Sequence, residues 1–164
     1  SGGGGRGADS KGDRRGRAFG REVHDFAERY ARREGAIDPL SVDGEDVANV
    51  VALLDPLIAD SDADLRVEEN VYLPLAVDGE RVTISGTADL VVVREDRVEI
   101  LDYKTDLDRR AEPEYRKQVS VYYHVAREVF PDRDIRLGLF YTAAGEVIDI
   151  EPMDKSELVR VLEG

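Results

Sequence analysis

Cysteine is absent from this chain of 164 residues, which excludes disulfides, thiolate catalysis, zinc knuckles and iron–sulfur clusters. Long hydrophobic runs are absent too. No apolar segment approaches the roughly 20 residues of a membrane-spanning helix, and no secretory signal is present. We therefore expect a cytoplasmic protein with no membrane partner.

Lysine is scarce, whereas acidic residues are abundant. Four lysines stand beside 19 arginines, and 36 acidic residues give a net charge of −13. The hydrophobic fraction of 41% is too high for a disordered chain. A net negative charge ordinarily argues against a nucleic-acid partner. Scarce lysine with abundant acid suggests a halophilic protein, adapted to concentrated salt; the alternative is an ordinary acidic domain.

The charge is distributed unevenly along the chain. Residues 1–33 carry a net charge of +4, and residues 34–164 carry −17. The first 13 residues are rich in glycine, which predicts a flexible tail or linker, and the chain begins with Ser rather than Met, which indicates a fragment of a longer protein. We expect one domain over residues 14–164.

The basic end holds the candidates for contacts to nucleic-acid phosphates, because arginine side chains there precede or lie on the first predicted helix. These candidates are Arg14, Arg15, Arg17 and Arg21. An exposed helix face, balanced by Glu22 and Glu28, is the alternative explanation.

Hydrophobic periodicity predicts the secondary structure. We expect helices over 15–34, from Asp43 or Asp46 as cap to about 57, over 112–130 and over 154–162, with strands over 65–77, 81–93, 97–104, 135–141 and 147–150. Pro74 indicates an edge strand or a bend, Asp78-Gly79 a hairpin turn, and Gly86 a bulge. This order of elements predicts an α/β fold with a mixed β-sheet flanked by helices.

Two aspartates lie within largely apolar predicted strands. Asp89 lies in the run 88–93, which should form a covered central strand, and Asp102 lies in the next strand. A carboxylate in such a place is costly unless it is paired or binds a metal. A tight turn over 94–96 brings the strands together, and Lys104 points to the same face as Asp102. Such a site suits Mg²⁺ or Mn²⁺ and a phosphate.

The spacing of these residues resembles the signature of RecB-type nucleases of the PD-(D/E)XK superfamily. The resemblance rests on Gly86-Thr87-Ala88-Asp89, Asp102-Tyr103-Lys104-Thr105, Gln118 and Tyr122, with Arg15-Gly16, His24 and Glu69 upstream. It covers residues 14–151 and implies a restriction-endonuclease-like fold and Mg²⁺-dependent DNA cleavage, often from ends. It also suggests the C-terminal nuclease domain of a helicase–nuclease of the UvrD/RecB/AddA kind.

The resemblance implies a role for each matched residue. Asp89 and Asp102 would bind the metal, joined by the backbone carbonyl of Tyr103 and by His24, and Lys104 would position the attacking water. One branch of the family carries an iron–sulfur cluster on four cysteines, and the lack of cysteine argues against membership of that branch.

Four positions have weaker signals. Gln118 and Tyr122 lie one helical turn apart and would contact the lysine region or the DNA, but Tyr122 also fits the packing stripe of its helix. Glu69 is a possible additional acid, although the adjacent Glu68 shows how easily a surface acid falls at this position. His24, taken alone, could be a solvated helix residue.

The function expected from the sequence is that of a metal-dependent DNA nuclease, and more specifically an exonuclease that acts on single-stranded ends beside a helicase motor. Two alternatives stay open: a catalytically silent DNA-binding or scaffold module of the same fold, and an RNA-directed or structure-specific endonuclease. Retention of Asp89, Asp102 and Lys104 together argues against the silent module.

Overall fold

The computed structural model of the chain describes residues 16–33 and 44–163. Within them the elements are α2 (Arg17–Ala31), α3 (Gly44–Ala59), β1 (Asp64–Val77), β2 (Glu80–Val93), β3 (Arg97–Lys104), α4 (Glu112–Val129), β4 (Asp134–Tyr141), β5 (Glu146–Ile150) and α5 (Lys155–Glu163). The strands form one sheet in the order β1-β2-β3-β4-β5, and β3 and β4 are its parallel pair. The predicted mixed sheet in an α/β fold is confirmed.

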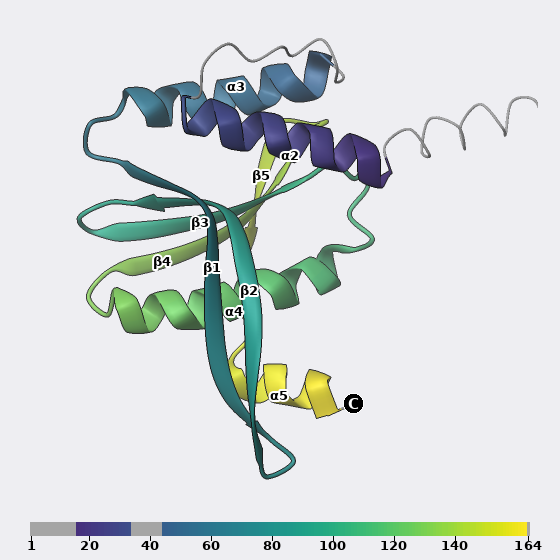
Figure 1. The fold of residues 1–164 in the computed structure, drawn as a ribbon, viewed down its shortest axis with the longest axis vertical. Helices are drawn as coiled ribbons and strands as arrows, with labels where there is room; N and C mark the ends of the chain where they lie inside the picture. Colours follow the sequence, from purple (N-terminus) through teal and green to yellow (C-terminus); the bar gives the residue numbers. More distant parts are fainter. Residues whose placement is uncertain (1–15, 34–43, 164) are drawn as a thin grey trace, which may run out of the picture.

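The centre of the sheet is covered on both faces because its strands are apolar on both sides. Leu90 and Val92 of β2 pack against α2 and α3. Val91 and Val93, which alternate with them, pack against α4 on the opposite face. Figure 1 shows α2 and α3 along one face of the sheet and α4 along the other. The prediction that residues 88–93 form a covered central strand is confirmed.

The hairpin of β1 and β2 is much longer than the part of it that pairs with β3. Strand β3 pairs with β2 over Leu90–Val93, and the rest of the hairpin extends past α4 towards α5 (Figure 1). Its inner face packs on both helices through Leu73 and Leu75. Glu68, with a φ of 50°, marks a kink in β1. Strand β2 therefore separates from β3 at Asp89, and this separation positions the site described below.

Two local predictions differ from the structure. The β1–β2 register continues without a break through Gly86, which pairs with Val71, so Gly86 is not a bulge. A Cβ at Gly86 would lie 3.2 Å from Val121 Cγ1, and the glycine instead lets α4 approach the hairpin closely. Asp46 does not cap α3. It lies inside the helix, fully buried, and accepts a hydrogen bond from Thr142 Oγ1 at 2.6 Å.

Several predictions concern residues outside 16–33 and 44–163: the tail over residues 1–13, the cap at Asp43, and the phosphate contacts of Arg14 and Arg15. Within the described ranges, no helix is both long enough and apolar enough to cross a membrane.

Candidate active site

The two strand carboxylates meet where β2 and β3 separate. The backbone N–H of Asp89 donates to Asp102 Oδ1 at 3.1 Å, and the backbone N–H of Tyr103 donates to Asp89 Oδ2 at 2.8 Å. The last regular pair of the two strands is Leu90 with Leu101, which are the chain neighbours of Asp89 and Asp102. Side-chain oxygens thus accept the backbone hydrogen bonds at the point where the ladder ends. The predicted convergence of the two aspartates is present in the structure.

Burial makes the charge of Asp102 costly. Only 7% of its side chain is exposed, against 19% for Asp89. This burial, followed by the charge of Asp89, raises the pKa of Asp102 to about 6, although Lys104 and His24 act to lower it. The charged form of Asp102 is therefore disfavoured, mainly because its side chain is removed from water.

His24 reaches the carboxylates from α2, on the other side of the sheet from α4. Its Nδ1 donates to the carbonyl of Gly20 at 2.7 Å, and its Nε2 lies 3.2 Å from Asp89 Oδ2. Burial acts to lower the pKa of the imidazole, but the hydrogen bond and charge of Asp89 outweigh burial and raise it overall. His24 is thus a member of the cluster rather than a solvated helix residue.

Lys104 is held by three neighbours. Its Nζ lies 3.9 Å from Asp102 Oδ2, donates to Gln118 Oε1 at 3.4 Å, and lies 3.9 Å from the centroid of the Tyr115 ring. The last contact is a cation–π interaction with α4. The predicted proximity of Asp102, Lys104 and Gln118 is present, and the lysine is 13% exposed.

Tyr115 and Asp106 belong to this cluster, although the sequence did not point to them as site residues. Tyr115 Oη donates to Asp106 Oδ2 at 2.7 Å, which fixes the ring beneath Lys104. Burial and this hydrogen bond raise the pKa of Tyr115. The available signal was the spacing of three residues between Tyr115 and Gln118, which places both on one helix face.

The two aspartates and Lys104 line a pocket of about 360 Å³, whose walls come from α2, β2, β3 and α4. Its lining residues are His24, Ser85, Gly86, Thr87, Asp89, Asp102, Lys104 and Gln118. An adjoining pocket of about 320 Å³ shares His24 and Lys104 and extends to Arg17, Asp106 and Tyr115. The polar groups therefore converge on solvent-accessible space, where a phosphate group could enter.

Three predicted residues do not line the pocket of Asp89 and Asp102, although Tyr103 lines the adjoining one. Tyr122 is 6% exposed and packs in the core beneath α4; burial, with the charge of Glu69, raises its pKa to about 12. Glu69 is half-buried and lies 3.8 Å from Arg66 Nε. The Tyr103 ring packs edge-on against His24, while its backbone N–H binds Asp89. The packing alternative accounts for the placement of Tyr122.

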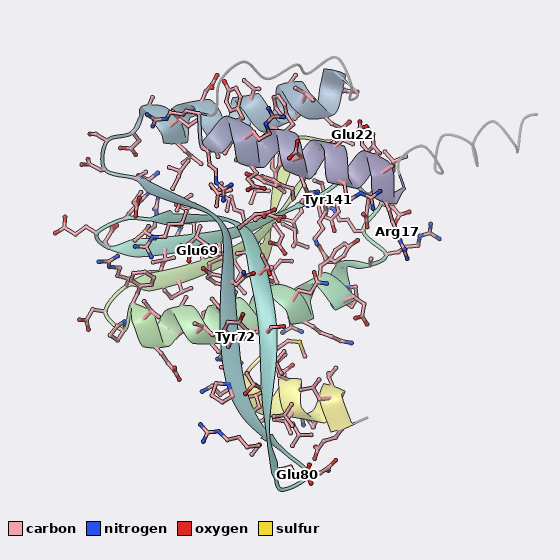
Figure 2. The ribbon with its side chains drawn as sticks, viewed as in Figure 1. Arg17, Glu22, Glu69, Tyr72, Glu80 and Tyr141 are labelled. Carbon is pink, nitrogen blue, oxygen red and sulfur yellow. The ribbon has the colours of Figure 1, made fainter. Side chains whose placement is uncertain are left out.

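The two described arginines at the start of α2 differ in their position relative to the site. Both are exposed, and Arg17 lines the pocket that adjoins the carboxylates. Figure 2 shows Arg17 at the beginning of α2. Arg21 is not among the residues that line either pocket. Contacts of Arg17 and Arg21 to phosphates stay predictions.

The donor set fits a hard divalent cation in its chemistry. Two carboxylates from neighbouring strands lie with one imidazole, and these oxygen and nitrogen donors are of the kinds that divalent cations bind. In residues 16–33 and 44–163, no three or more His, Asp or Glu side chains are arranged as a formed metal site. Metal binding by His24, Asp89, Asp102 and the Tyr103 carbonyl stays a prediction.

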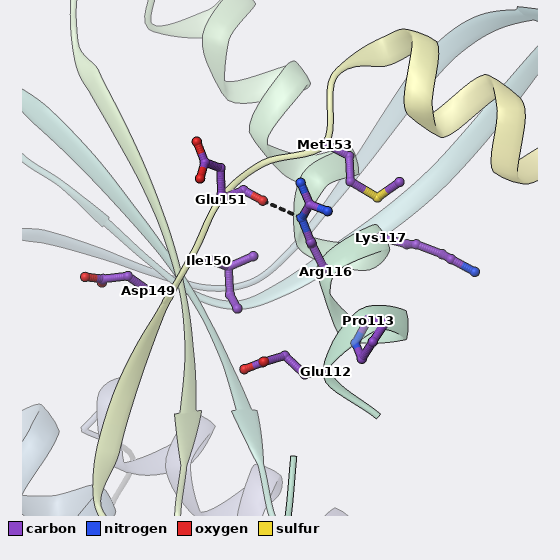
Figure 3. Close-up of a pocket in the computed structure, with 8 residues that line it drawn as sticks. All are labelled: Glu112, Pro113, Arg116, Lys117, Asp149, Ile150, Glu151 and Met153. Atoms are coloured by element: carbon purple, nitrogen blue, oxygen red, sulfur yellow. Dashed lines mark hydrogen bonds between the residues drawn. The ribbon is translucent and has the colours of Figure 1, made fainter. Parts of the chain in front are cut away.

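A separate cavity of about 430 Å³ lies between α4 and the segment around β5. In Figure 3, Arg116 crosses it, and its Nε donates to the carbonyl of Glu151 at 2.7 Å. It shares no lining residue with the pocket of Asp89 and Asp102.

A mixed sheet whose separating central strands carry two aspartates, with a lysine two residues after the second, defines a nuclease-type architecture. The chain belongs to the PD-(D/E)XK nuclease superfamily, whose family model matches residues 3–161. The sheet and its flanking helices agree with the restriction-endonuclease-like fold of that superfamily. No curated protein matches the chain. A solved structure described as "Crystal structure of SSO0001" is 18% identical, with a TM-score of 0.45. The alignment covers 86% of this chain and 72% of that one.

Proposed function

We propose that this chain is a metal-dependent deoxyribonuclease of the RecB type that hydrolyses phosphodiester bonds. One observation carries the proposal: Asp89, Asp102 and Lys104 line a single pocket together with His24 and Gln118. In a family whose members share a metal-dependent hydrolytic site, this convergence favours an active enzyme over a silent scaffold.

Lys104 is the residue that we propose to orient the attacking water. Its Nζ can donate to a water or to a phosphate oxygen, and its contacts to Gln118 and Tyr115 limit the directions in which it can point. A positive charge at this position also offsets the charge that develops on the phosphate in the transition state.

Asp89 and Asp102 would hold Mg²⁺, for which Mn²⁺ can substitute, with His24 and the Tyr103 carbonyl as further ligands. When bound, the ion would polarise the phosphate and lower the pKa of a water. The hydrogen bonds from the backbone N–H groups of Asp89 and Tyr103 keep the two carboxylates oriented between the strands.

The finer assignment follows the order of the motifs along the chain. His24, Asp89, Asp102-x-Lys104 and Gln118 occur in the order of RecB-type nucleases, which supports an exonuclease acting on DNA ends beside a helicase motor, in DNA repair or recombination. Scarce lysine and the net charge of −13 support an enzyme that works in concentrated salt in the cytoplasm of a halophile.

A nuclease assay tests the proposal. Linear single-stranded DNA is incubated with Mg²⁺, Mn²⁺ or EDTA across a range of KCl concentrations, and wild type is compared with Lys104→Ala. We expect metal-dependent cleavage that Lys104→Ala abolishes. Lys117→Ala is the matched control, because Lys117 is a second lysine of the same region that pairs with Glu114 outside the site. Undiminished cleavage by purified Lys104→Ala would overturn the assignment.

The same assay separates the alternatives. Cleavage of circular single-stranded DNA would identify an endonuclease, and cleavage of RNA alone would identify a ribonuclease. A DNA shift in a gel without cleavage in any metal would identify the silent binding module. Activity confined to low KCl would contradict the halophilic assignment.

A further inference from the structure

One exposed face of the β1–β2 hairpin lacks acidic side chains. Residues that lie directly opposite one another in an antiparallel pair present their side chains on the same face. The face opposite to α4 and α5 is therefore formed by the pairs Asn70–Thr87, Tyr72–Ser85, Pro74–Thr83 and Ala76–Arg81. We call these eight residues the hairpin strip.

Every residue of the hairpin strip is exposed. Its side chains are hydroxyls, an amide, a ring and small apolar groups, and its one charged member is Arg81. In a chain with 36 acidic residues and a net charge of −13, this strip can approach a phosphodiester backbone without repulsion from its own side chains. The hydroxyl groups of Thr83 and Ser85 can donate hydrogen bonds to phosphate oxygens.

Tyr72 lies at the centre of the strip. It is 66% exposed, the highest value among the large hydrophobic side chains exposed in the described residues, and the one aromatic among them. Figure 2 shows Tyr72 on β1 between Glu69 and the hairpin tip near Glu80. An exposed ring on a sheet surface is a platform on which an unpaired base can stack.

The hairpin strip is continuous with the candidate active site. Ser85 and Thr87 belong to the strip and also line the pocket that contains Asp89, Asp102 and Lys104. Ser85 is the register partner of Tyr72. A strand whose phosphate lies in the pocket can therefore extend along the hairpin, so that a base a few nucleotides away reaches Tyr72.

We propose that the hairpin strip is the binding track for the single-stranded DNA that enters the active site, with Tyr72 as its base-stacking residue. The proposal rests on the proposed nuclease function for the direction in which the track leads. Because a base must be unpaired to stack on Tyr72, this track selects single strands over duplexes.

The test is the affinity for a short fluorescent oligothymidylate, measured by anisotropy in EDTA so that no cleavage takes place. Tyr72→Ala should weaken binding by between about 5-fold and about 100-fold, the range for loss of one stacked base, whereas Tyr72→Phe should restore most of the affinity. The loss should be much smaller for a blunt duplex of the same length, whose bases are already stacked.

A charge substitution tests the track independently. Thr83→Glu adds one negative charge to the hairpin strip and should weaken binding at least about 3-fold at low salt. Ser156→Glu is the matched control: it makes the same change of net charge at an exposed hydroxyl of α5, outside the strip. Circular dichroism and melting curves establish that each variant is folded.

Equal affinity of wild type and Tyr72→Ala, equal effects of Thr83→Glu and Ser156→Glu, or no binding by wild type would each overturn the track. Cleavage of labelled DNA by wild type is measured in parallel with Mg²⁺. If wild type cleaves DNA but Tyr72→Ala binds as tightly as wild type, the binding track is refuted and the nuclease function is supported. If Tyr72→Ala loses binding but wild type does not cleave DNA, the binding track is supported and the nuclease function is refuted.

Discussion

Asp102 and Asp89 lie on neighbouring strands, and the carboxylate of Asp102 accepts a hydrogen bond from the backbone N–H of Asp89 at 3.1 Å. The carboxylate of Asp89 in turn accepts one from the N–H of Tyr103, directly after Asp102. Each aspartate thus stabilises the backbone of the other's strand where β2 and β3 separate. The same hydrogen bonds orient both side chains and hold the two carboxylates together in a largely buried place, where burial and the charge of Asp89 disfavour the charged form of Asp102.

The first prediction is that Asp102→Asn increases stability and abolishes cleavage. Burial and the charge of Asp89 raise the pKa of Asp102 to about 6, and an amide removes the buried charge while its oxygen can still accept the hydrogen bond from Asp89. We expect the free energy of unfolding near neutral pH, in EDTA, to rise by about 1–3 kcal/mol. Urea denaturation measures it, and a less stable variant would contradict the prediction.

The pH dependence of this effect has a defined sign. The pKa of Asp102 is higher in the folded state than its ordinary value of 3.8, so the folded state takes up the proton first as the pH falls. This group's contribution is therefore greatest below about pH 4 and is lost as the pH rises through about 6. The raised pKa of His24 acts in the same direction. The difference between wild type and Asp102→Asn isolates the aspartate and should shrink towards pH 4.

The second prediction concerns the ring beneath Lys104. Tyr115→Leu removes the cation–π contact at 3.9 Å and leaves the lysine less well oriented, so kcat should fall about 10-fold with little change in KM. Tyr115→Phe keeps the ring but loses the hydrogen bond to Asp106, and it should recover most of the rate. Steady-state kinetics measure both. Equal kcat values for wild type and Tyr115→Leu would exclude a positioning role.

The sequence predicted most of the fold because its elements are marked by local patterns. Apolar residues alternate with polar ones in β1, which predicts one buried face, and they form a continuous run in β2, which predicts two. The burial of the side chains in the structure follows both patterns. The bulge at Gly86 was predicted wrongly. A glycine inside a strand indicates either a bulge or a close neighbour, and the neighbour, Val121, is 35 positions away and invisible to local patterns.

The candidate site was predicted in part for a similar reason. Asp89, Asp102 and Lys104 are charged residues within largely apolar strands. Burying a charge in such a strand costs free energy, and this makes them recognisable as site residues from the sequence. Tyr115 and Asp106 are an aromatic residue on an amphipathic helix and an acid in a loop, which are common features of any surface. The contact between Tyr115 and Asp106, and that of Tyr115 with Lys104, depend on how α4 packs across β3, which local sequence does not specify.

The third prediction concerns a buried hydrogen bond that joins α3 to the end of β4. Thr142 Oγ1 donates to Asp46 Oδ2 at 2.6 Å, and both residues are fully buried. Thr142→Val removes this donor from a buried carboxylate and should lower the free energy of unfolding by about 1–3 kcal/mol. Thr142→Ser keeps the hydroxyl and is the matched control. Similar destabilisation by the two variants would assign the effect to methyl packing instead.

The last prediction addresses metal binding without any assay of cleavage. A ligand that binds the folded state alone raises the melting temperature in proportion to the logarithm of its concentration above Kd. We expect Mn²⁺ to raise the melting temperature of wild type, and to do so less in Asp89→Asn, which removes a charged oxygen donor. Asp149→Asn is the control, because Asp149 is an acid of the separate cavity beside β5. An equal effect of Mn²⁺ on wild type and Asp89→Asn, with a smaller effect on Asp149→Asn, would place the ion in that cavity.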